Sequence, residues 1–430
     1  MARKFLKKKF AFQFMIATLK NKFGLLKPFE FAILINAIGI NFIKFIPYGI
    51  LLLVSTWIYE VFIKKSLKFN FKILFSNYNF WFLTLPFWLA VFGLIYTSNF
   101  SKGFEDLGRI IPFLIFPILL FSIETEQKKS LNSFVLASFM FGLIIRFSID
   151  FCDSFICFTY DYNIQNFFYT YLDSDTNILS IISMFAALFA LEFLNVTKLN
   201  FNRKVIFQIL ILFLSLCILL LQSRIVILFY LVSLCFLLIY HWRKQGKWNI
   251  FSTLLFSAIL MLLPPFQGRF QAAAVKSESL IKKDTFKLDS NSNVESLPCM
   301  SSTQLRFNSR KASLEIIKRN PILGVGTGDW QDELVKEYQN AEMPCNAHEK
   351  TAPHNQYLRT SLKFGFLGLA IYLFYLFRLF QIQRKERAFG QLAFLITIIF
   401  CGLGYDLLDV GSSAPFIAFF STWLFFKRVK

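Results

Sequence analysis

Charged residues are scarce in this 430-residue chain, where Asp, Glu, Lys and Arg together make up 17 %. That low fraction excludes an intrinsically disordered protein, and no large soluble domain is evident. Histidine is also rare, at three residues, and no Cys/His set has the spacing of a zinc site. The basic N-terminus leads into Phe-rich and Leu-rich stretches without a small-residue cleavage signal, so we expect no secretory signal peptide.

Hydrophobic residues dominate instead, at 56 %, and 58 of them are phenylalanine. Soluble proteins carry roughly 45–50 % apolar residues, and a membrane-spanning helix needs about 20 of them in a row. The sequence therefore predicts an all-α polytopic membrane protein with about 12 transmembrane helices. The predicted spans are 29–46, 47–63, 80–96, 110–123, 131–150, 177–195, 205–221, 225–241, 250–266, 356–377, 392–405 and 413–427.

The net charge of +20 would suit a protein that binds nucleic acid, but the distribution of the basic residues along the chain indicates a membrane protein. Basic clusters recur at every second loop, for example at Lys64 and Lys65 and at Arg384 and Lys385. This positive-inside pattern predicts cytoplasmic termini and no nucleic-acid partner. Three regions follow, namely spans one to nine in 1–266, a large outer loop in 267–355 and spans ten to twelve in 356–430.

The second half of the outer loop, from 304 to 355, has its own helical pattern. Ser302 or Thr303 can cap a helix that runs to Arg319, where an Asn-Pro pair ends it. The glycines of GVGTG then permit a tight turn, and Asp329 can cap a second short helix. A nucleotide loop would need a preceding strand, which this region lacks. We therefore expect the turn to bring the backbone close to a helix or a bound substrate.

Arg146 and Asp150 lie one helical turn apart in the fifth predicted span, so they can form an ion pair on one face. Such a pair is compatible with a simple interfacial role or with ion coupling in a transporter or flippase. The absence of internal repeats between the two halves of the chain disfavours a transporter. Cys299 and Cys345 both fall in the outer loop, and a disulfide between them is left open.

The candidate site residues lie on the outer side of the predicted membrane. His354 is followed by Asn355 where the tenth span begins, and Arg224 stands in a short QSR turn. Arg306 and Arg310 are one turn apart on the loop helix, and a guanidinium group suits phosphate oxygens. Interfacial anchoring remains an alternative for each arginine, as does a structural role for the histidine.

Three segments together carry a family resemblance: the QSR turn, NPILGVGTGDW and HNQYL. In this order the chain resembles the O-antigen ligase and polymerase family of bacterial envelope glycan transferases, from about Ser215 to the C-terminus. The resemblance implies a GT-C-type glycosyltransferase of the bacterial inner membrane that uses no metal or cofactor. Its active site would face the periplasm. The donor would be a glycan on undecaprenyl diphosphate, and the acceptor a sugar hydroxyl of lipid A-core or of another glycan.

The resemblance also implies roles for single residues. His354 would be the general base, and Arg224 and Arg306 would hold the diphosphate. Arg359, directly after HNQYL, departs from the smaller polar residue usual there. The ligase is the preferred interpretation and the polymerase the alternative. The further substrate-binding candidates are Arg310, Arg109, Asn355 and Gly326.

Overall fold

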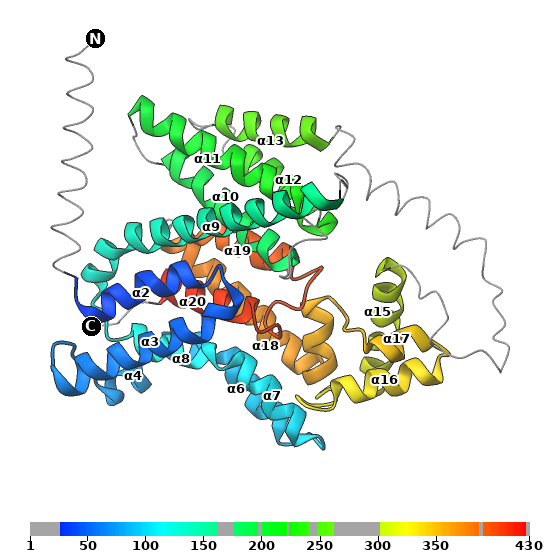
Figure 1. The fold of residues 1–430 in the computed structure, drawn as a ribbon. Coiled ribbons are helices and arrows are strands. Elements are labelled where there is room, and N and C mark those ends of the chain that lie inside the picture. The colour runs from blue at the N-terminus through cyan, green and yellow to red at the C-terminus, as the bar shows by residue number, and fades with distance from the viewer. Residues whose placement is uncertain are drawn as a thin grey trace, which may run out of the picture. The chain divides into compact units, whose positions relative to one another are not determined.

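The computed structural model describes residues 26–161, 176–196, 200–221, 223–240, 247–261, 302–386 and 390–426. Every regular element in these ranges is helical, which confirms the predicted all-α class (Figure 1). Three features of the sequence lie outside the described residues, namely Cys299 of the possible disulfide, Gln222 of the QSR turn and the first half of the outer loop.

The chain divides into two compact units. The first contains the described residues up to Asn70 and also Ser122–Ile144. Buried polar groups join its helices, because the Glu60 carboxylate accepts from the Phe29 amide at 2.9 Å and Trp57 donates to Ser122 at 2.6 Å. Its elements are α2 (Pro28–Gly39), η1 (Ile43–Phe45), α3 (Ile46–Ile58), the π-helix η2 (Tyr59–Ile63) and the first part of α9 (Thr125–Asp161).

The second unit contains residues 71–121 and 145–430. Phenylalanine rings fill its core: Phe185 of α10 packs on Phe394 of α19 and on Phe420 of α20, with ring centroids 5.9 and 4.9 Å apart. Its helices before the loop are α4 (Phe71–Ser76), α5 (Tyr78–Leu83), α6 (Leu85–Leu94), α7 (Phe100–Ile110), α8 (Pro112–Leu120), the rest of α9, α10 (Thr176–Val196), α11 (Phe201–Leu220), α12 (Arg224–Tyr240) and α13 (Lys247–Met261). Those after it are α15 (Ser302–Arg319), α16 (Trp330–Asn340), α17 (Pro344–Glu349), α18 (Gln356–Glu386), α19 (Gln391–Cys401) and α20 (Ser413–Phe425).

Within the described residues, four helical segments are long and apolar enough to cross a membrane, and further apolar helices are shorter. The protein is thus a helical membrane protein, while the count of 12 spans stays a prediction. The expected span 80–96 is divided at Thr84, because Pro86 occupies the first turn of a new helix, α6, where its missing N–H is tolerated. The four long segments are Ile43–Ile63, Ser130–Ile156, Thr176–Leu194 and Gln356–Lys385.

Several predicted details are confirmed. Arg146 donates to Asp150 at 2.9 Å within α9. The two loop helices form as α15 and α16, and they share an apolar core that includes Ile316, Leu334 and Leu362 of α18. The short helices α7 and α17 were not predicted, since α7 is too polar for a span and α17 has only six residues.

The glycine turn after α15 packs against α18 where that helix is interrupted. Gly365 has a φ of 63°, so the α18 hydrogen-bond ladder opens there. Val325 and Gly326 donate their amides to the freed carbonyls of Leu362 and Lys363, at 3.0 and 2.8 Å. In return, the amides of Phe366 and Leu367 donate to the carbonyls of Pro321 and Ile322. The close approach to a helix predicted for this turn is thereby confirmed.

Candidate active site

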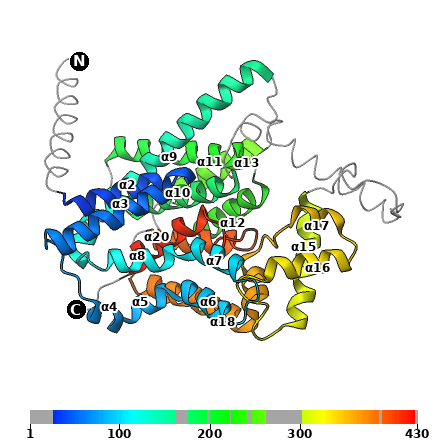
Figure 2. The same ribbon diagram turned by 60° about the horizontal axis from the view of Figure 1, so that its bottom comes forward.

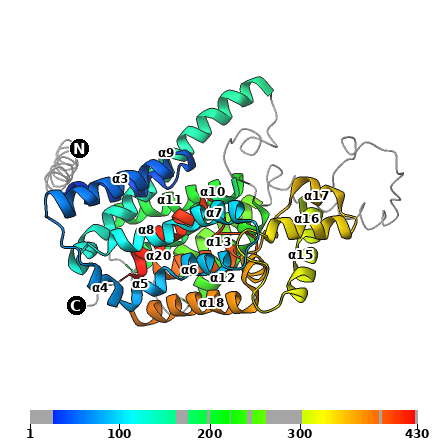
Figure 3. The same cartoon turned by 90° about the horizontal axis from the view of Figure 1, so that it is seen from below.

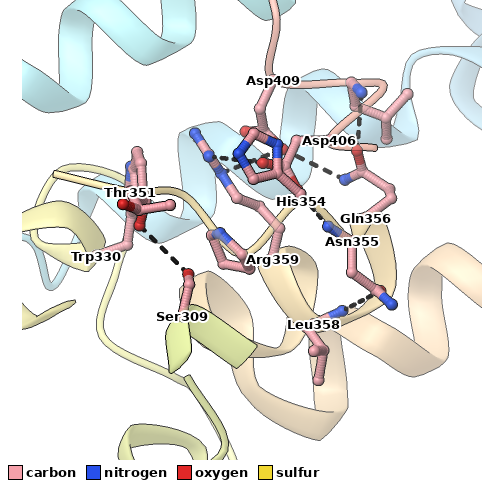
Figure 4. Close-up of polar contacts among 12 residues, drawn as sticks. Ser309, Trp330, Thr351, His354, Asn355, Gln356, Leu358, Arg359, Asp406 and Asp409 are labelled. Carbon is pink, nitrogen blue, oxygen red and sulfur yellow. Dashed lines mark hydrogen bonds and ion pairs between the residues drawn. The ribbon is translucent and has the colours of Figure 1, made fainter. Parts of the chain in front are cut away.

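His354 lies in the link between α17 and α18, in a left-handed backbone conformation with a φ of 48°. The guanidinium group of Arg310 holds this link, because it donates to the carbonyl oxygens of Pro353 and His354 at 3.5 and 3.2 Å. The next amide, that of Asn355, donates to the Asp406 carboxylate at 2.9 Å. The unusual conformation is therefore fixed from both sides of the residue. Figure 4 shows His354 with Asn355 and Asp406.

Asn355 begins α18. Its side-chain oxygen accepts from the amide of Leu358 at 3.0 Å, the bond expected of an N-cap residue. Its side-chain nitrogen donates to the carbonyl of Leu403 at 3.1 Å. Asn355 thus fixes the backbone next to His354 in two ways. It caps α18, and it bonds the segment that links α19 and α20.

Arg359, the residue that departs from the family pattern, is buried in the site. Its guanidinium donates to Asp406 at 3.2 Å and stacks on the Trp330 ring, 3.5 Å from the ring centroid. The Asp406 carboxylate therefore bonds both the Asn355 amide and Arg359 (Figure 4). Asp406 and Trp330 connect the start of α18 to the α19–α20 link and to α16.

A second set of buried charges lies one turn further along α18. Lys363 forms ion pairs with Asp106 of α7, at 2.9 Å, and with Asp409. Trp330 donates to Asp106 at 2.7 Å, and Arg109 pairs with the same carboxylate at 3.2 Å. The buried carboxylates Asp106, Asp406 and Asp409 are thus each paired with a cation, namely Arg109, Arg359 or Lys363, of which Arg109 is partly exposed and also pairs with Glu105. Such pairing is needed because an unpaired buried charge is strongly destabilising.

The charges around His354 act on it in opposite directions. Partial burial lowers the pKa of the imidazole from 6.5, and Arg306, Arg359 and Arg310 lower it further, while Asp406 raises it. The net effect is a lowered pKa, so the imidazole is neutral at pH 7 and able to accept a proton. The sequence indicated Arg306 and Arg310, but not Arg359 or Asp406.

Arg306 lies on α15 over the ring of Tyr405, 5.8 Å from the centroid. The Tyr405 hydroxyl lies 2.6 Å from the hydroxyl of Ser223 and donates to Asn177 at 2.9 Å. Ser223 directly precedes Arg224, the first residue of α12. Tyr405 therefore connects Arg306 to the QSR turn, two predicted site elements that are far apart in the sequence.

The remaining predicted residues take the following places. Gly326 has a φ of 97° and packs against Thr97, so an added Cβ would lie 2.5 Å from the Thr97 hydroxyl. Arg109 pairs with Asp106 and Glu105, and His348 lies in α17. In the part of the chain that the structure describes, no group of three His, Cys, Asp or Glu side chains is placed to hold a metal ion.

Six buried or stacked residues of this site were missed from the sequence. The available signal was charge in apolar surroundings, in LKFGFLGL for Lys363 and in YDLLDV for the two aspartates. Lys363 lies within the predicted span 356–377, where a charge is costly unless it has a partner and therefore indicates a functional site by default. Asp406 and Asp409 lie in the short apolar link between the last two predicted spans. The missed residues are Asp106, Trp330, Arg359, Lys363, Asp406 and Asp409.

Fold and site together define a helical membrane protein in which a histidine is surrounded by guanidinium groups at the start of a long apolar helix. Residues 209–373 match the family model described as O-antigen ligase. This match confirms the predicted resemblance to the O-antigen ligase family, and the matched range includes Arg224, Arg306, Arg310 and His354. No curated protein matches the chain.

Proposed function

We propose that the protein is a glycosyltransferase of the O-antigen ligase type. It would move a glycan from undecaprenyl diphosphate to a sugar hydroxyl of lipid A-core, at the periplasmic face of the bacterial inner membrane. The observation that carries this proposal is the set of charged side chains that act on the imidazole of His354. His354 lies inside the range that matches the family model. A neutral imidazole next to several guanidinium groups suits a reaction in which a hydroxyl attacks and a diphosphate departs.

In the proposed step, the imidazole of His354 takes the proton of the acceptor hydroxyl. The acceptor oxygen forms a bond to the anomeric carbon, and the bond from that carbon to the diphosphate oxygen breaks. The electron pair of the broken bond leaves with the diphosphate. Asp406 would stabilise the imidazolium as it forms, since its carboxylate favours the protonated state.

The cations would act on the leaving group. Arg306 and Arg224 are the proposed diphosphate ligands, because a fixed donor fork matches phosphate oxygens and requires no metal ion. Tyr405 supports this assignment, as it contacts Arg306 and the residue that precedes Arg224. Arg310 and Asn355 would position His354, since each already bonds the backbone beside it or caps α18.

A polymerase of the same family is the alternative, with a second glycan as the acceptor. Ligase and polymerase would use the same base and the same diphosphate ligands, so the envelope of a deletion strain must distinguish them. Loss of all long glycan from lipid A-core, with lipid-linked polymer accumulating, is expected of a ligase. A single repeat still attached to lipid A-core would instead indicate a polymerase. Unchanged surface glycan with impaired movement of lipid-linked glycan across the membrane would indicate a flippase and contradict the proposal.

A further inference from the structure

One face of α15 does not take part in the core that this helix shares with α16 and α18. Phe307, Lys311, Leu314 and Lys318 follow one another at spacings of four, three and four residues, so they form a single stripe along the helix. All four are exposed, with 63 % of Phe307 and 47 % of Leu314 accessible. The opposite face carries the buried residues Ala312, Ile316 and Ile317. The stripe therefore alternates large apolar and cationic side chains.

The apolar surface continues past the end of α15. Ile322 is 70 % exposed, and Leu323 is also exposed. The backbone of this segment is bonded to α18 at Phe366 and Leu367, both of which are exposed as well. Phe366 and Leu367 belong to the segment Gln356–Lys385, which is long and apolar enough to cross a membrane. Ile322 and Leu323 thus connect the end of α15 to exposed apolar residues of a segment that is long and apolar enough to cross a membrane.

The orientation of the α15 axis is the one expected of a helix that lies on the membrane surface. Figures 2 and 3 show α15 running across the direction of α6 and α18. A helix that lies crosswise to a membrane span runs along the plane of the bilayer, where an amphipathic helix can bury its apolar side chains among the acyl chains.

The two lysines suit the headgroup region. A lysine stem can lie along apolar surface while its ammonium group reaches the phosphate level. Lys318 pairs with Glu315 at 2.8 Å, but 70 % of the lysine side chain and 46 % of the glutamate are exposed, and such pairs contribute little. Both ammonium groups therefore remain accessible to anionic phosphates.

We propose that this face of α15, together with the loop up to Leu323, binds the outer leaflet of the bilayer. Phe307, Leu314 and Ile322 insert among the acyl chains, and Lys311 and Lys318 contact phospholipid phosphates. This contact matters for the site, because α15 also carries Arg306 and Arg310, and Arg310 bonds the carbonyl of His354. The bilayer then fixes the height of the site above the membrane surface. The inference depends on the membrane character of the protein and not on its reaction.

Photocrosslinking of the full-length protein in nanodiscs of phosphatidylethanolamine and phosphatidylglycerol tests the inference. A photoreactive benzoylphenylalanine is placed at Phe307 or Leu314, and intact-protein mass spectrometry detects covalent lipid. Phe366 serves as the positive control, and the exposed residue Gln339 of α16 as the negative control. We expect lipid adducts at positions 307, 314 and 366, and at least tenfold fewer at 339. Cross-links to other parts of the chain at 307 and 314, or no more lipid there than at 339, would overturn the proposal.

The lysines are tested separately from the apolar residues. With the label at Leu314, the double variant Lys311→Gln and Lys318→Gln should reduce the yield of phosphatidylglycerol adducts and leave the yield of phosphatidylethanolamine adducts less affected. Lys336→Gln on α16 is the matched control, because that lysine is equally exposed and pairs with Glu333. An identical lipid preference in the double variant and in the control would remove the lysines from the contact.

Discussion

At the scale of the single residue, His354 depends on charges that come from three separate parts of the chain. Arg306 and Arg310 belong to α15, Arg359 to α18 and Asp406 to the α19–α20 link. The guanidinium groups oppose protonation of the imidazole, and the carboxylate favours it. In the proposed reaction this combination keeps the base neutral at rest and gives the imidazolium a partner once the proton has moved.

The pH dependence of transfer follows from these charges. A base with a lowered pKa is active above that pKa, so the acidic limb of kcat/KM should lie below pH 6.5. Arg310→Gln removes a positive charge and should move this limb to higher pH. Asp406→Asn removes the negative charge and should move it to lower pH. If the acidic limbs of the two variants moved in the same direction, or did not move, His354 would not be the titrating group.

The arginines that would hold the diphosphate give a second prediction. Arg306→Ala and Arg224→Ala should reduce transfer by 10²-fold or more, since removal of one donor to a developing anion costs roughly 10²–10³ in kcat. Lysine at either position should restore activity only in part, because an ammonium group lacks the donor fork. Transfer is measured on purified protein whose yield in the membrane matches the wild type. Full activity of an alanine variant would remove that arginine from the proposed site.

The sequence identified His354 and Arg224 because they stand beside or within short motifs, and Arg306 and Arg310 because they lie one turn apart on the predicted loop helix. It did not find Asp406, Trp330 or Lys363, because their importance lies in partners that are distant along the chain. Lys363 pairs with Asp106, 257 positions earlier. Arg359 looked like a departure from the family pattern, and its buried pairing with Asp406 accounts for its presence here.

At the scale of the helices, the junction between the glycine turn and α18 holds the loop helices to the rest of the second unit. The interruption at Gly365 leaves two carbonyls and two amides without partners inside α18, and the turn supplies all four. In a membrane such groups must be satisfied within the protein. The junction thereby connects the residues of α15 to the helix that begins beside His354.

Gly365→Ala should weaken this junction. A Cβ there would overlap the Ile322 carbonyl, and a φ of 63° alone costs a non-glycine residue roughly 1–3 kcal/mol. We expect a lower melting temperature in detergent and reduced transfer. Gly108→Ala on α7 is the control, since no atom beyond its chain neighbours and the backbone of its own helix lies within 4 Å of its Cβ position. This variant should be neutral or raise stability by up to about 1 kcal/mol. Equal melting temperatures for the two variants would refute the role of the junction.

The helices themselves were largely predictable, because hydropathy and caps are local properties. The structure confirms α15, its end before Pro321, and α16. It differs where local signals mislead: α9 extends well beyond 131–150, and α18 continues past 377 to Glu386. The cause in both cases is that a helix does not stop where its apolar stretch stops, unless Gly or Pro interrupts it.

At the scale of the whole molecule, the charge pattern predicts which side of the membrane each loop occupies. A reporter fused near Ser290 should be periplasmic, and one fused near Gly246 cytoplasmic. Alkaline phosphatase and green fluorescent protein fusions measure the two locations. Both fusions on one side would contradict the proposed periplasmic site, whatever the activity of the protein.

The most direct measurement of the central claim is transfer by purified protein from an undecaprenyl-linked donor, with EDTA present throughout. His354→Ala should lose 10²–10⁴-fold in rate, the usual contribution of a general base. His348→Ala should be far milder, because His348 lies in the short helix α17 and is not among the groups that act on His354. Undiminished transfer by His354→Ala, or loss of wild-type activity in EDTA, would contradict the account.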